Sequence, residues 1–237
     1  MQIKWFKELD STNDELLRHI SEYDNLSVVA ALRQTAGRGQ RGNRWVSEGG
    51  ENLTFSLLLR PSGLPATEFM SLTYLATLSV KGWLCSQGVP AVIKWPNDIY
   101  VGNRKICGML VENTLSGRRI AASVIGIGLN LNQTEFPGEL TNPTSLKRLT
   151  GKDYPLEETL KELLAGFDFP ALESRAGRVR LWEDYQDGLF QQGLRRPYRN
   201  LLTGEEFMGT IKGVTYEGRL LMADGNTFSF KEIGYVI

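Results

Sequence analysis

Residues 91–129 read AVIKWPNDIYVGNRKICGMLVENTLSGRRIAASVIGIGL, and this stretch decides the fold class. Runs rich in apolar and β-branched residues predict strands at 91–95, 99–101, 105–111 and 120–129. The Pro-Asn-Asp and Gly-Asn sequences that separate the first three runs are typical of turns. Strands this close together indicate hairpins rather than regular strand–helix alternation. We therefore expect an α+β fold with a mixed sheet.

Helices and further strands are expected on both sides of this stretch. The Ser-Thr-Asn-Asp sequence that starts at Ser11 should begin a helix, with Thr12 and Glu15 as a capping box ahead of an apolar stripe. Periodicity and composition predict strands at 27–32 and 53–59, a long buried helix at 67–85, and helices at 156–167 and 179–190.

The chain changes character near Gly193. Short strands are expected at 206–211, 219–222 and 227–230, with Glu-Gly and Asp-Gly-Asn turns between them. Strands at this spacing indicate a small barrel of roughly 45 residues. We therefore expect two domains, a larger one at 1–190 and a small C-terminal one at 191–237.

Composition excludes several classes of protein. Of the 237 residues 41% are hydrophobic and 23% charged, which is typical of a globular chain and not of disorder or a coiled coil. Lys+Arg and Asp+Glu number 27 each, so a globally basic nucleic-acid-binding protein is not expected. Cys85 and Cys107 have no metal-ligand spacing and indicate free thiols, and the single His19 is interpreted as structural. No signal peptide or membrane span is predicted, so we expect a cytoplasmic protein.

Residues 34–45 read QTAGRGQRGNRW and follow a predicted strand. Glycines allow backbone N–H groups to approach an anion, and arginines offer forked donors to phosphate or carboxylate. No acidic residue lies between Ala31 and Ser47, so the sequence gives these cations no neighbouring counter-ion. The segment predicts an anion-binding loop, with Trp45 able to stack on a nucleotide base.

Other interpretations of this loop are weaker. Its glycines satisfy G-x-G-x-x-G, but a dinucleotide site needs a helix directly afterwards, and residues 43–52 have no helical stripe. The Gly-Lys-Ser/Thr of a P-loop and the HRD and DFG motifs of protein kinases are absent from the sequence. A solvated surface loop with a charge cluster is the alternative that stays open.

Three later motifs are ambiguous taken singly. Residues 94–98 (KWPND) form a common turn, but they also place a Lys and an Asp where they could serve a phosphate and a metal or proton. Residues 105–112 (KICGMLVE) indicate a core strand, with Lys105 at its start and Gly108 allowing a close approach to the backbone. Residues 126–132 (GIGLNLN) end a strand with small residues that either ease packing or form a pocket floor.

The order of these motifs is specific. Gln34, GRGQRGNRW, KWPND, K-x-x-G-x-L-x-E and GIGLNLN together resemble the biotin protein ligase family, and the resemblance extends from Ser11 to the β-rich tail. It implies an α/β catalytic domain of the biotin/lipoate ligase type followed by a small SH3-like barrel. Because the motifs begin at residue 11, it also implies the monofunctional type without the N-terminal DNA-binding domain that some members carry.

The resemblance implies an ATP-dependent ligase that works in two steps. Biotin is activated as biotinyl-5′-AMP, with Mg²⁺ as cofactor, and is then transferred to a lysine of a biotin carboxyl carrier protein or domain. One departure is Gln40, because the family loop is commonly G-R-G-R-x-G. Gln40 has no charge, so retention of the adenylate is in question.

Residue roles follow from the matched motifs. Lys105 is the first choice for a catalytic residue, Arg38 should touch the biotin carboxylate and the α-phosphate, and Asp98 is a candidate base. The implied biotin site comprises Ser11, Thr12, Asn13, Gln34, Gly37, Arg38, Gly39, Gln40, Lys105, Gly108 and Met109. The implied ATP site comprises Arg38, Arg41, Trp45, Lys94, Asn97, Asp98 and Asn130, and Asp98 is the implied metal ligand.

Two alternatives and several expectations complete the prediction. A lipoate or octanoate ligase or transferase of the same superfamily is the nearest rival. A non-catalytic ligand- or nucleic-acid-binding module is the rival of another class. We expect no DNA or membrane partner, and either a monomer or a homodimer. Residues 37–50 should form a mobile loop that orders over the adenylate, with Trp45 as its lid contact.

Overall fold

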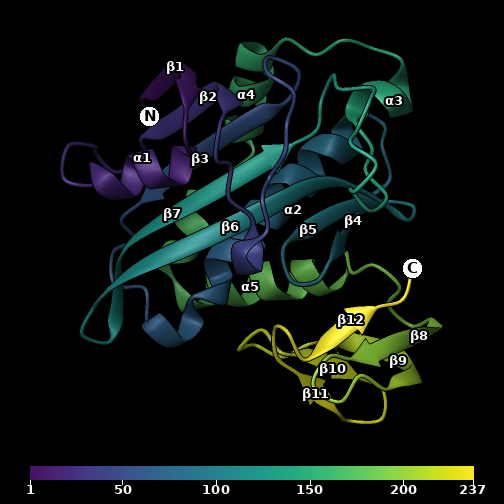
Figure 1. The fold of residues 1–237 in the computed structure, drawn as a ribbon. Coiled ribbons are helices and arrows are strands. Elements are labelled where there is room, and N and C mark those ends of the chain that lie inside the picture. Colours follow the sequence, from purple (N-terminus) through teal and green to yellow (C-terminus); the bar gives the residue numbers. More distant parts are fainter.

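The chain folds around a mixed sheet with helices on both faces (Figure 1). This computed structural model describes residues 1–237, except the side chain of Arg41. Among the described residues the main sheet has seven strands in the order β1-β2-β3-β7-β6-β5-β4. Only β1 and β2 run parallel, and every other neighbouring pair is antiparallel. The strands are β1 (Ile3–Leu9), β2 (Val28–Gln34), β3 (Leu53–Leu59), β4 (Ala91–Lys94), β5 (Asp98–Val101), β6 (Arg104–Ser116) and β7 (Arg119–Leu129).

The two faces of the sheet carry different layers. Side chains alternate along β3, so Phe55 and Leu57 enter the main core while Leu58 packs with Leu16 of α1 in a smaller cluster. The main core lies on the face covered by α2, α4 and α5, and α1 covers part of the opposite face (Figure 1). The helices are α1 (Thr12–Arg18), α2 (Met70–Ser86), α3 (Leu146–Thr150), α4 (Leu156–Ala165) and α5 (Arg175–Gln186), with short 3-10 helices η1 (Gln40–Gly42), η2 (Ala66–Glu68) and η3 (Phe169–Glu173).

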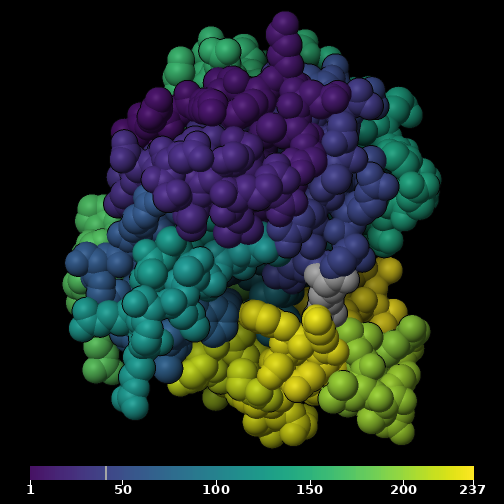
Figure 2. Space-filling model, turned by 60° about the vertical axis from the view of Figure 1, so that its left-hand side comes forward, coloured from purple at the N-terminus to yellow at the C-terminus, as the bar shows by residue number. Residues whose placement is uncertain are grey.

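The C-terminal residues form a second, antiparallel sheet in the order β11-β10-β9-β8-β12. Its strands are β8 (Arg195–Asn200), β9 (Glu206–Val214), β10 (Leu220–Met222), β11 (Thr227–Phe228) and β12 (Ile233–Tyr235). The yellow-green mass in Figure 2 shows this sheet packed against the rest of the molecule. Trp95 is one contact, because its Nε1 donates to the Gly218 carbonyl at 3.0 Å and its ring lies 5.1 Å from that of Phe230. The sheet order is open, so the strand pairing alone does not make a closed barrel.

Most predicted elements are confirmed. The strand at 53–59 has the predicted bounds, the helix at 67–85 is α2 preceded by η2, and hairpins connect β4 to β7 as expected. No helix in the described chain has the length and apolar character that crossing a membrane requires. Both cysteines are free.

Some boundaries were wrong. The N-cap of α1 is Ser11, whose hydroxyl accepts from the Asp14 backbone N–H, and Thr12 is already helical. The last long helix begins at Arg175 and not at 179, because the Ser174 side chain caps it there, and it ends at Gln186 and not at 190. Strands β1, β8 and β12 were missed, because each is short or half-exposed and lacks clear alternation.

Candidate active site

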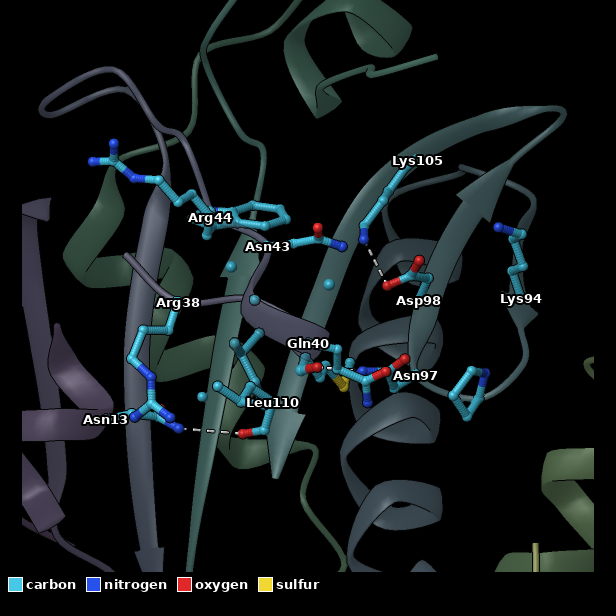
Figure 3. Close-up of a pocket in the computed structure, with 18 of the residues that line it drawn as sticks. Asn13, Arg38, Gln40, Asn43, Arg44, Lys94, Asn97, Asp98, Lys105 and Leu110 are labelled. Carbon is cyan, nitrogen blue, oxygen red and sulfur yellow. Dashed lines mark hydrogen bonds and ion pairs between the residues drawn. The ribbon is translucent and has the colours of Figure 1, made fainter. Parts of the chain in front are cut away.

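A cavity of about 410 Å³ opens on the face of the main sheet that carries α1. Its walls come from the start of α1, the end of β2, the glycine-arginine loop, the β4–β5 turn, β6, β7 and the C-terminal sheet. Segments that the sequence separates by more than 200 residues therefore share one site. Figure 3 shows Arg38 and Asn13 on one side and the Lys105–Asp98 pair on the other, with Gln40 between them.

Glycines form the floor of this cavity. Gly108 of β6 and Gly128 of β7 are register partners, and the indole of Trp45 lies directly over them. A Cβ at Gly128 would overlap the indole, and one at Gly108 would lie 3.1 Å from it. The Nε1 of Trp45 is buried without a hydrogen-bond partner among the described residues. The two glycines thus create a trough that a flat group can occupy, and in the structure this group is Trp45.

Lys105 and Asp98 form an ion pair on the cavity wall. Their Nζ and Oδ1 atoms are 2.7 Å apart, and both side chains are largely buried. The bulge in the β5–β6 pairing brings Lys105 beside the trough, where its Nζ lies 5.8 Å from the centre of the Trp45 ring. Asn97, from the same turn as Asp98, donates to the Met109 carbonyl. This wall therefore carries a fixed cation with its own counter-ion.

Polar side chains at the start of α1 form a connected network. Ser56 of β3 contacts Thr12 Oγ1 at 2.7 Å and Asn13 Oδ1 at 2.6 Å. Gln34 Oε1 accepts from the Thr12 backbone N–H at 2.8 Å. Gly126 makes room for Asn13, because a Cβ there would overlap the Asn13 amide oxygen. Gly126 of β7 thus lets α1 approach the sheet closely.

Arg38 is compensated by acids that are distant in the sequence. Its guanidinium pairs with Asp14 of α1 and, through both Nη atoms, with Glu112 of β6. The hydrogen bond with Glu112 raises the pKa of Arg38 above its ordinary value. The prediction that these cations lack counter-ions was therefore wrong for Arg38. Its acidic partners lie outside the loop, on α1 and β6.

Lys94 lies in an aromatic cage at the far end of the cavity. Its Nζ is 4.9 Å from the centres of both the Tyr100 and Tyr235 rings and 3.3 Å from the Tyr100 hydroxyl. Burial lowers the pKa of Lys94, and Asp98 partly opposes this effect. Because Tyr235 belongs to β12, the C-terminal sheet completes this end of the site.

Most of the predicted site residues come together in the cavity. Its lining includes Ser11, Thr12, Asn13, Gln34, Arg38, Gly39, Gln40, Trp45, Lys94, Asn97, Asp98, Lys105, Gly108 and Met109. Gly37 lines a smaller adjoining hollow. Asn130 lies elsewhere, buried with its amide donating to the Thr144 carbonyl. The prediction for Arg41 lies outside the described side chains. His19 is half-exposed and contacts Glu22, away from the cavity.

Sequence reasoning missed four residues that shape the site. Asp14 and Glu112 hold Arg38, Ser56 joins Asn13 to Thr12, and Tyr235 closes the Lys94 end. Two signals were available: Ser56 interrupts an apolar strand, and Glu112 ends the K-x-x-G-x-L-x-E motif. Nothing in the sequence marked Tyr235.

The described side chains contain no group of three or more His, Cys, Asp or Glu arranged to hold a metal ion. Asp98 offers one carboxylate, and Lys105 already neutralises it at 2.7 Å. Mg²⁺ commonly binds one or two carboxylates together with substrate phosphates. The donor set therefore fits a cation that arrives with a polyphosphate, not one held by the protein alone.

The fold and site are those of a ligase family: residues 5–130 match the Biotin/lipoate A/B protein ligase family, and the chain belongs to it. The chain is 36% identical over 164 residues to a biotin–acetyl-CoA-carboxylase ligase of Paracoccus denitrificans, covering 67% of this chain and 68% of that one. It is 33% identical over 204 residues to the bifunctional ligase/repressor BirA of Bacillus subtilis (strain 168). That match covers 83% of this chain, and this chain spans 61% of the relative's length.

Solved structures agree with this assignment. The biotin protein ligase of Aquifex aeolicus in complex with biotin and ATP superposes with a TM-score of 0.79 at 28% identity, covering 98% of this chain and 97% of that one. The expected α+β fold with a mixed sheet is therefore confirmed.

Proposed function

We propose that this chain is a biotin–biotin carboxyl-carrier-protein ligase. It activates biotin with ATP as biotinyl-5′-AMP and transfers the biotinyl group to a lysine of a biotin carboxyl carrier protein or domain. One observation carries the proposal: the cavity brings the Ser-Thr-Asn segment, the glycine-arginine loop, the KWPND turn and Lys105 together around a glycine trough. Relatives named as biotin ligases support it.

In the first step an oxygen of the biotin carboxylate attacks the α-phosphorus of ATP. The new O–P bond forms the mixed anhydride, the bond to the β-phosphate oxygen breaks, and pyrophosphate leaves. Two anions must approach each other, so fixed cations are needed where charge develops. Lys105 lies beside the trough with its ammonium oriented by Asp98, and it stabilises this charge.

In the second step the neutral amine of the carrier lysine attacks the anhydride carbonyl, and AMP leaves with the electrons of the C–O bond. The nitrogen then loses a proton. Asp98 is the candidate acceptor for a proton of the incoming lysine, because its carboxylate lies on the same wall. Once the ligand has displaced the Trp45 indole from the trough, the indole is proposed to cover the adenylate and reduce access of water, which would protect the anhydride from hydrolysis.

Asp98 would hold a Mg²⁺ ion together with the phosphates of ATP. The cation supplies charge neutralisation at the phosphates. Lys94 is proposed to serve the same end of the nucleotide, and its position over the Tyr235 ring supports this role.

The C-terminal residues 191–237 are proposed to form a separate small domain after a catalytic domain at 1–190. Support comes from β8 to β12, which pair only with one another in the described sheet order. An SH3-like arrangement is the proposal for this domain, since β8 to β11 pair in chain order and the last strand, β12, returns to pair with the first, β8. No DNA partner is proposed.

The test is pyrophosphate release with MgATP and either biotin or lipoate. Wild-type protein is expected to release pyrophosphate with biotin only. Lys105→Ala should reduce this release by about 100-fold or more, because one fixed donor to a developing charge commonly contributes that much. Lys147→Ala is the matched control, since it removes a Lys–Asp pair at 2.6 Å outside the cavity.

Each outcome is decisive. Release with lipoate would assign the chain to the sister branch of the family. No release with either acid would indicate a binding module, and salt-dependent DNA binding would then support that rival.

A further inference from the structure

Glu112 joins the two sides of the network at the start of α1. Its carboxylate accepts from Asn13 Nδ2 at 2.8 Å and from Arg38 Nη1 and Nη2 at 3.1 and 2.7 Å. Three N–H groups from α1 and the glycine-arginine loop therefore converge on one side chain of β6. That side chain is firmly placed, because Glu112 pairs with Val124 in the interior of the long β6–β7 hairpin.

A carboxylate only accepts hydrogen bonds, and this fixes the order of donors along the network. Asn13 must turn its NH₂ group toward Glu112 and its amide oxygen toward Ser56. The Ser56 hydroxyl has one proton and donates it to this oxygen, 2.6 Å away. Its contact with Thr12 Oγ1, 2.7 Å away, is then made as an acceptor, so the single proton of the Thr12 hydroxyl goes to Ser56 and not to Gln34 Oε1 at 3.2 Å. The negative charge on Glu112 thus determines which groups donate and which accept as far as Thr12, three side chains away.

This order matters for the ligand that the proposed function requires. A cyclic urea has two N–H donors on either side of one carbonyl acceptor, so its recognition depends on the polarity of each neighbouring group. A site whose donor faces a donor loses far more binding than one with a missing apolar contact. Asn13 and Ser56 are buried, so water cannot compensate for a reversed bond.

We propose that Glu112 is a positioning residue for the biotin site. It sets the donor–acceptor order of Asn13, Ser56 and Thr12, and its bidentate pair with Arg38 holds the glycine-arginine loop against that network. Glu112 itself does not line the cavity, so it acts through its neighbours. The inference rests on the proposed function.

Glu112→Gln tests the proposal with almost no change of shape. The amide has one acceptor atom in place of two, so its NH₂ group must face a donor of either Asn13 or Arg38. Rotation of the Asn13 amide relieves that conflict but turns its NH₂ toward Ser56, which reverses the network. Arg38 keeps its pair with Asp14, so it is not released entirely.

The experiment measures KM for biotin, KM for ATP and kcat by pyrophosphate release, biotin binding by calorimetry, and the unfolding midpoint. Glu112→Gln should raise both the KM and the Kd for biotin at least tenfold and raise the KM for ATP by a clearly smaller factor, because Arg38 keeps its pair with Asp14. The double variant Glu112→Gln/Asn13→Asp should recover part of this loss, because Asp at 13 accepts from the new amide and still accepts from Ser56. Glu8→Gln is the matched control, since it removes a Glu–Arg pair at 3.0 Å on the exposed surface.

Three results would overturn the inference. One is an unchanged biotin KM in folded Glu112→Gln. Another is a parallel rise in both KM values without recovery in the double variant, which indicates general distortion. The third is wild-type protein that releases no pyrophosphate with biotin, and this alone removes the proposed function as well.

Discussion

At the scale of single residues, the site depends on the absence of side chains at three glycines as much as on its charged groups. Gly108, Gly126 and Gly128 have ordinary extended backbone, so their role is space and not conformation. Gly126 admits the Asn13 amide, while Gly108 and Gly128 admit a flat ring. One methyl group on this floor therefore competes directly with whatever binds there.

Gly128→Ala should reduce biotin-dependent pyrophosphate release by about 100-fold, because the new Cβ overlaps the position of the Trp45 indole and narrows the trough by one methyl layer. Gly82→Ala is the matched control. Gly82 lies inside α2 with nothing near its Cβ position, so alanine should stabilise the fold by about 0.5–1 kcal/mol and leave activity unchanged. Full activity in a folded Gly128→Ala protein would show that the trough is not used.

At the scale of elements, the glycine-arginine loop contributes Trp45 to the floor of the cavity. The indole rests on β6 and β7 and lies next to Lys105. A ligand that occupies the trough must displace it, and the orphaned Nε1 loses nothing by leaving. We therefore expect ligand binding and movement of this loop to be the same event.

Tryptophan fluorescence measures this movement. Biotin with MgATP should change the emission of the wild-type protein as the Trp45 indole changes surroundings. The change should be lost in Trp45→Phe, which keeps the other four tryptophans. Trp182→Phe is the control, because Trp182 lies at the C-terminal interface, where its Nε1 donates to the Val214 carbonyl at 2.8 Å. An identical change in wild type and Trp45→Phe would contradict the prediction.

Elements with a strong local signal could be predicted from the sequence, and the pairing of charges could not. The apolar runs of 53–59 and of α2 depend only on neighbours in the chain, so both elements were predicted. The partner of Arg38 is Glu112, 74 residues away, and only the register of β6 brings it close. Short edge strands such as β12 depend on β8 for their pairing, so their own residues carried too little signal.

At the scale of the whole molecule, a hydrogen bond connects the C-terminal domain to a largely buried ion pair of the main domain. Glu68 of η2 accepts from Arg178 Nε of α5 at 2.5 Å and from the Tyr216 hydroxyl, beyond β9, at 2.7 Å. The same sheet supplies Tyr235 to the Lys94 cage and Gly218 to Trp95. Loss of the contact between Glu68, Arg178 and Tyr216 should therefore disturb the nucleotide end of the cavity more than the biotin end.

Glu68→Gln should lower the free energy of unfolding by about 2 kcal/mol, because it leaves Arg178 largely buried beside a neutral amide. Burial opposes ionisation of Glu68, but the hydrogen bonds from Arg178 and Tyr216 outweigh it, so its pKa in the folded protein is below the ordinary value of 4.5. The stabilisation is thus fully present above pH 4.5 and is lost as the pH falls through the lowered pKa.

Chemical denaturation of wild-type and Glu68→Gln protein between pH 7 and pH 3 should show that the difference between their free energies of unfolding shrinks toward acid. A difference that grows toward acid would mean that the folded pKa is raised. Because the contact between Glu68, Arg178 and Tyr216 lies on the side of the C-terminal sheet, the variant should raise the KM for ATP more than that for biotin.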